Sequence, residues 1–181
     1  MKKIYIFAVV LIVLIIGIYL LKSQYYVKNM LPLSALDKIE NWNFKGAYTD
    51  NIELKNKAED EIKKLNDKLG IASTDYEIYV SIANQYMLIG DGKKTYEYLN
   101  RALVIDSNIT GLAWHNMGVL LERLKAPNTA KIAYERAFTA QNILQYQTAY
   151  IDFLQRYFPD EYEKEISKTV EETPVQNTLT N

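Results

Sequence analysis

The sequence contains no cysteine and a single histidine, His115. The absence of cysteine excludes disulfide bonds and thiol chemistry, and it is compatible with any redox compartment. With one histidine and no cysteine, neither a typical zinc site nor a nucleophile–histidine–acid triad can be assembled. We therefore expect no metal and no cofactor.

Carboxylates are plentiful, but they stand in runs. Examples are residues 59–61 and the series Glu161, Glu163 and Glu165. Such runs are typical of a solvated helix face rather than of a catalytic pair. The sequence therefore predicts no catalytic residues, and we expect a protein that is not an enzyme.

Positive charge is scarce beyond the start of the chain. Four of the 21 Lys and Arg residues precede residue 29, and none of the 22 acidic residues does. The rest of the chain therefore carries five more acidic than basic side chains. Nucleic-acid binding needs clustered Lys and Arg against phosphates, so we expect no nucleic-acid partner.

The one long apolar run begins at Ile4 and ends at Leu21, between Lys3 and Lys22. A helix over residues 4–21 would measure about 27 Å, close to the hydrocarbon thickness of a bilayer. This predicts a transmembrane signal-anchor within residues 1–28, with a cytoplasmic N-terminus and an extracytoplasmic remainder. The alternative is a cleaved secretory signal, although the run is long for one and no Ala-x-Ala site follows.

The middle of the sequence repeats itself at a step of 35 residues. Both copies read as two amphipathic helices joined by a tight turn, so each copy predicts one helical hairpin. The first copy carries Tyr79, Ile82, Ala83, Tyr86, Thr95, Leu99 and Ala102, and the second carries Trp114, Met117, Gly118, Leu121, Ala130, Tyr134 and Ala137.

The second copy has Trp, Met-Gly and Leu on its first helix and Ala, Tyr and Ala on its second. This pattern resembles the tetratricopeptide repeat. The resemblance implies an α-solenoid that serves as a protein-binding scaffold. The small residues, Gly118 among them, are expected where two helices cross closely, because a larger side chain would force the axes apart.

The flanks predict degenerate hairpins that cap the repeats. Residues 29–74 would form an N-terminal hairpin, with a short helix through Leu36, Ile39 and Trp42 and a longer helix stopped by Gly70. Residues 75–142 hold the two clear repeats, 143–172 a C-terminal hairpin, and 173–181 a disordered tail. The expected fold is all-α, with a transmembrane helix followed by a tetratricopeptide-like solenoid of about three to four hairpins.

In the family, the first helix of each hairpin lines a concave groove. Asn84 and Asn116 match two asparagines that hold a carboxylate in chaperone-binding members, but Val80 replaces an expected lysine. A mixed groove for a helix or an extended peptide fits better. The resemblance assigns the groove to Val80, Asn84, Met87, His115, Asn116, Val119 and Glu122.

The groove has two other possible occupants, namely a helix within residues 160–171 of the same chain and a second copy of the protein. The expected function is a membrane-anchored scaffold or adaptor that binds a protein or peptide partner and supports a cell-envelope or membrane complex. The alternative is a self-associating or obligate structural subunit of a membrane assembly, such as a secretion or pilus system, with no peptide in the groove.

Overall fold

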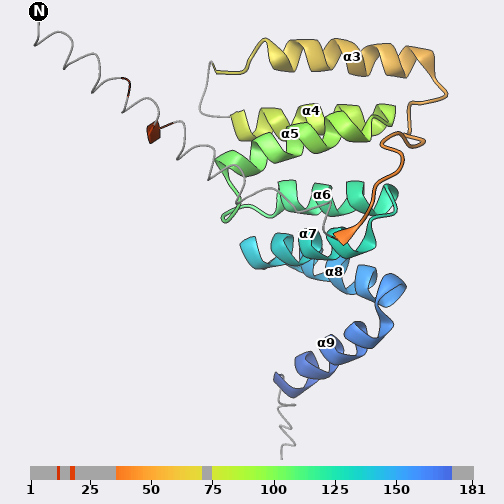
Figure 1. The fold of residues 1–181 in the computed structure, drawn as a ribbon, viewed down its shortest axis with the longest axis vertical. Helices are drawn as coiled ribbons and strands as arrows, with labels where there is room; N and C mark the ends of the chain where they lie inside the picture. Colours follow the sequence, from red (N-terminus) through yellow and green to blue (C-terminus); the bar gives the residue numbers. More distant parts are fainter. Residues whose placement is uncertain (1–11, 13–16, 19–35, 71–74, 173–181) are drawn as a thin grey trace, which may run out of the picture.

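Seven helices follow one another along the described part of the chain (Figure 1). The computed structural model describes residues 36–70 and 75–172, together with Ile12, Gly17 and Ile18. In these residues the fold is all-α, as predicted, and the β-type pairing is limited to an isolated bridge between Asn43 and Asp91. The helices are α3 (Ile52–Asn66), α4 (Asp75–Ile89), α5 (Gly92–Ile105), α6 (Leu112–Arg123), α7 (Pro127–Ala140), α8 (Leu144–Tyr157) and α9 (Pro159–Glu172).

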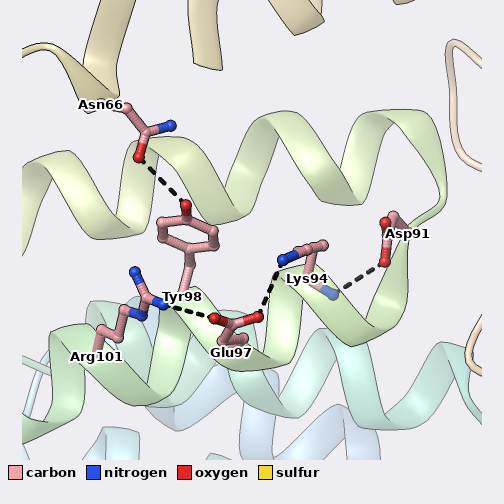
Figure 2. A network of polar contacts seen from close by, with 6 residues as sticks. All are labelled: Asn66, Asp91, Lys94, Glu97, Tyr98 and Arg101. Carbon is pink, nitrogen blue, oxygen red and sulfur yellow. Dashed lines mark hydrogen bonds and ion pairs between the residues drawn. The ribbon is translucent and has the colours of Figure 1, made fainter. Parts of the chain in front are cut away.

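The helices stack in two layers. Helices α4 and α5, α6 and α7, and α8 and α9 form three successive hairpins, and α3 packs against α4 as α5 packs against α6. Tyr98 of α5 donates a hydrogen bond to Asn66 of α3 at 3.2 Å, beside the ion pairs that link Glu97 to Lys94 and Arg101 (Figure 2). The second helices α5, α7 and α9 therefore form one layer with α3, and the first helices α4, α6 and α8 form the other.

The small residues of the repeat lie at close helix crossings, as predicted. A Cβ atom added at Gly118 of α6 would lie 2.9 Å from ring carbons of Tyr134 of α7, closer than real Cβ contacts come. A larger residue at such a crossing would overpack the contact. The alanines of the pattern are at most 1% exposed; they are Ala83, Ala102, Ala130 and Ala137.

A segment that is not helical, residues 37–49, runs along the edge of the stack where the α4–α5 and α6–α7 turns lie (Figure 1). We call this segment the strap. The carbonyl of Trp42 accepts a hydrogen bond from the N–H of Gly92 at 2.8 Å, and the N–H of Tyr48 donates to the carbonyl of Leu88 at 2.8 Å. The predicted short helix through Ile39 and Trp42 is therefore wrong, because the backbone there pairs with the α4–α5 turn. Residues 29–35 of that predicted hairpin lie outside the described residues.

Three glycines bring the strap into backbone contact with the α4–α5 turn. A Cβ atom at Gly90 would overlap the carbonyl oxygen of Phe44, one at Gly92 that of Trp42, and one at Gly46 that of Leu88. Gly90 also has a φ of +93°, a conformation that other residues rarely adopt. Glycine is therefore required on both sides of this contact.

Helices α6 and α7 begin without a capping side chain of their own, because Gly111 and Ala126 precede them. The first N–H groups of a helix have no partner within it and need one elsewhere. The hydroxyl of Tyr76 accepts from the N–H of Ala113 at 3.1 Å, and the carboxylate of Asp37 accepts from the N–H of Thr129 at 2.7 Å. Helix α4 and the strap thus fix the first turns of α6 and α7.

The prediction of a transmembrane helix is corrected. No helix among the described residues is long and apolar enough to cross a membrane. The 15-residue helices α3 and α4 measure about 22 Å, short of a bilayer's hydrocarbon thickness. Ile12, Gly17 and Ile18 are helical, and the rest of residues 4–21 lies outside the described residues, as do residues 173–181.

Helices α8 and α9 occupy the residues predicted for the C-terminal hairpin. Helix α9 packs against α8, and its Glu161 accepts from the ammonium group of Lys131 of α7 at 2.7 Å and 2.9 Å. Helix α9 therefore lies on the side of the second helices and leads away from the stack (Figure 1). It does not cover the first helices, which excludes it as the occupant of the groove.

Candidate functional site

Two side-chain contacts join the first helices into one face, which we call the first-helix face. The side-chain amide of Asn116 in α6 donates to Oδ1 of Asn84 in α4 at 3.0 Å. The guanidinium group of Arg156 in α8 forms an ion pair with the carboxylate of Glu122 in α6. These contacts bridge consecutive hairpins, so they link α4 to α6 and α6 to α8.

The predicted groove residues of α4 divide between the face and the core. Asn84 is exposed and Met87 is half-buried, but Val80 is only 3% exposed and belongs to the hydrophobic core. The assignment of Val80 to the groove is therefore corrected. Val80 and Asn84 lie one turn apart on the same side of α4. The helices packed on α4, which are α3, α5 and α6, cover this side at Val80 and leave it open at Asn84.

Three of the four groove residues predicted in α6 lie on the first-helix face, and two of them are polar. Asn116, Val119 and Glu122 are half-buried. Glu122 is held on two sides, since the hydroxyl of Tyr134 donates to it at 3.0 Å and Arg156 donates to it from α8. Burial, reinforced by the nearby charge of Glu122, raises the pKa of Tyr134 well above its ordinary value. The hydroxyl of Tyr134 therefore remains a hydrogen-bond donor at neutral pH.

His115 lies between two aromatic rings and not in an open groove. Its ring centre is 5.7 Å from that of Tyr134 and 5.4 Å from that of Tyr146. Its Nδ1 atom is buried without a hydrogen-bond partner, and burial lowers its pKa. The imidazole is therefore neutral near pH 7 and acts as a packing residue at the margin of the first-helix face.

Arg156 contributes to the first-helix face, although the sequence analysis did not assign it there. The third hairpin departs from the small-residue pattern at Leu154, and no basic residue was expected on its matching helix face. A signal was present, because Arg156 follows Glu122 by 34 residues, close to one repeat step. Residues one step apart stack on neighbouring hairpins, so an acidic and a basic residue at this spacing indicate an ion pair between hairpins.

The arrangement offers hydrogen bonding and apolar contact. No set of three or more His, Cys, Asp or Glu side chains in the described part of the chain could hold a metal ion. The amides of Asn84 and Asn116 can donate and accept, and Val119 and Met87 add apolar surface.

Comparisons with protein-family models, with curated proteins and with solved structures give no match to this chain.

Proposed function

We propose that this chain is a protein-binding scaffold that holds a peptide or a helix of a partner protein on its first-helix face. The proposal is supported by the 35-residue repeat, by the resemblance of that repeat to the tetratricopeptide pattern, and by the stacking of helical hairpins. The observation that carries it is the pair of contacts Asn84–Asn116 and Glu122–Arg156, which hold three helices in one surface.

The chemistry of the face suits a peptide backbone flanked by apolar side chains. Asn84 is exposed, and Asn116, Val119 and Met87 are half-buried, so amide groups and apolar surface alternate across α4 and α6. Asparagine amides can bond both the N–H and the C=O groups of a bound segment. Val119 and Met87 can receive its side chains, as in other grooves that bind helices or extended peptides.

The test is crosslinking of the full-length protein in its native cells, with partners identified by mass spectrometry. An Asn84→Arg/Val119→Arg variant places two bulky cations on the first-helix face. An Asn56→Arg/Asn142→Arg variant makes the same change of charge at two exposed positions away from the face. We expect a partner that is recovered with the wild type and the control variant and lost with the face variant.

Recovery of the same partners with all three proteins would contradict the proposal, because the first-helix face would then not be the binding surface. Both variants must keep the helical content and unfolding midpoint of the wild type. The exposed control positions Asn56 and Asn142 should tolerate arginine within about 0.5 kcal/mol.

A second candidate is a self-associating structural subunit. The edge opposite the strap, where the α5–α6 and α7–α8 connections lie, exposes large apolar side chains. Ile109 and Leu144 are each 77% exposed. Light scattering of the full-length chain over a range of concentrations tests this candidate. A mass that rises with concentration and falls to the monomer in an Ile109→Glu/Leu144→Glu variant would favour it over the scaffold, and a constant monomer would exclude it.

A further inference from the structure

A second surface, on the strap edge, has the features of an anion site. The strap and the α6–α7 turn enclose a cleft there, separate from the first-helix face. The strap and the turn both line it, with three cations and one carboxylate; the lining residues are Lys38, Glu40, Asn41, Asn43, Phe44, Arg123, Leu124 and Lys125. Two segments about 80 residues apart in the sequence thus bring three cations to one cleft.

Most of this positive charge is not neutralised. Lys38 faces Glu40 at 3.8 Å, but both side chains are more than 80% exposed, so this ion pair is weak. Arg123 and Lys125 form no ion pair with any described residue. With three cations and the single carboxylate of Glu40 in its lining, the cleft therefore carries an excess of positive charge.

The cationic groups are also positioned before any ligand arrives. The guanidinium carbon of Arg123 lies 5.5 Å from the ring centre of Phe44, which fixes the guanidinium against the strap. A cation–π contact uses none of the N–H donors in a hydrogen bond to an acceptor, so they remain able to bind an anion. Lys125 has a φ of +58°, which turns the chain sharply after α6 and directs the next residues back into α7.

The strap half of the cleft is equally fixed. Asp37 holds it to α7 and Gly92 holds Trp42 beside it, so the segment carrying Asn41 and Asn43 is tied down at both ends. Oδ1 of Asn41 accepts from the N–H of Asn43 at 2.9 Å, which leaves the amide nitrogen of Asn41 to donate. Arginine, lysine and amide donors around one space match the acceptor oxygens of a carboxylate.

We propose that this cleft binds carboxylate side chains of an acidic segment in a protein partner. The inference rests on the proposed scaffold function, and it adds a second contact on the strap edge, apart from the first-helix face. The forked guanidinium of Arg123 takes one carboxylate in two parallel hydrogen bonds, and Lys125 and Lys38 take neighbouring carboxylates as point charges.

The test measures fluorescence anisotropy of a short fluorescein-labelled peptide of glutamate residues with the full-length protein at about 0.15 M salt. The cleft variant is Arg123→Gln/Lys125→Gln. The matched control is Lys63→Gln/Lys68→Gln, which removes two exposed cations in and just after the last turn of α3. We expect the cleft variant to bind at least about tenfold more weakly than the wild type and the control within about twofold.

Three results would overturn the proposal. They are no binding by the wild type, equal weakening in both variants, and binding of inorganic phosphate at the cleft while the peptide fails to bind. The Asn84→Arg/Val119→Arg variant separates this inference from the scaffold function. It must retain peptide binding even where partner capture is lost, whereas a failure confined to the anisotropy measurement would leave the first-helix face as the site.

Discussion

The carboxylate of Asp37 caps helix α7 from 92 residues away in the sequence. One oxygen accepts from both the N–H and the hydroxyl of Thr129 at 2.7 Å, and the other accepts from the amide of Asn128 at 3.0 Å. Ala126, which precedes the helix, has no acceptor in its side chain. The strap thus performs for α7 the task that an Asp or Ser at the preceding position performs in most helices.

Replacement of Asp37 by Ala should therefore destabilise the protein by about 1–2 kcal/mol, as loss of an N-cap does. Equilibrium urea unfolding followed by circular dichroism measures the change. Asp37→Asn keeps one acceptor and should lose less. Lys38→Ala, at a neighbouring exposed position, should change stability by less than about 0.5 kcal/mol. An Asp37→Ala protein as stable as the wild type would mean that the carboxylate does not cap α7 in solution.

Alanine substitutions at two glycines with positive φ distinguish the cost of backbone strain from the cost of displacing the strap. Gly70 and Gly90 have φ values of +76° and +93°, but a Cβ atom at Gly70 meets nothing within 4 Å, whereas one at Gly90 overlaps the carbonyl oxygen of Phe44. Gly70→Ala should cost only the conformational strain of about 1 kcal/mol. Gly90→Ala should cost about 2 kcal/mol more, because the strap must move.

Urea unfolding of both variants checks this comparison, and equal losses would show that the strap does not rest on the α4–α5 turn. Limited proteolysis is an independent test, because it measures how readily the strap is cleaved. Gly90→Ala should speed cleavage within residues 37–49, and Gly70→Ala should not.

The hairpins could be predicted because their packing is local and repeated. Gly118 and Tyr134 stand at fixed positions in the repeat, and their small-to-large contact follows from that spacing. The strap could not be found from helical spacing, since Ile39 and Trp42 lie three residues apart by coincidence. Its own signal has period two, because Trp42, Phe44, Gly46 and Tyr48 face the stack and the residues between them are exposed.

The candidate face was harder to predict than the fold. Helix α4 carries apolar residues around most of its circumference, with Ile78, Val80, Ile82 and Ala83 all buried. The spacing of apolar residues in α4 does not show which side of the helix is exposed to solvent. The packing of α3 against α4 determines that side. Asp37 and Thr129 show the same limit, since no local pattern pairs residues so distant.

The contact between Glu122 and Arg156 should show measurable coupling between the second and third hairpins. A double-mutant cycle with Glu122→Gln and Arg156→Gln isolates it. We expect a coupling of about 0.5–1 kcal/mol, because Arg156 is 54% exposed and solvent screens the pair. Urea unfolding of the four proteins provides the cycle. Additive effects of the two substitutions would show that α6 and α8 are not held together through this pair.

Stability should fall in mild acid because of His115. Burial between Tyr134 and Tyr146 lowers its pKa from the ordinary value of 6.5, so the unfolded chain takes up a proton before the folded one does. Uptake by the unfolded state favours unfolding, so the contribution of neutral His115 is complete above pH 6.5 and is lost as the pH falls through the folded-state pKa. Urea unfolding at about pH 7.5 and about pH 5.5 should show a larger loss for the wild type than for His115→Gln, which cannot titrate there. The carboxylates titrate alike in both proteins, so an equal loss in the two would place His115 in water instead of between the rings.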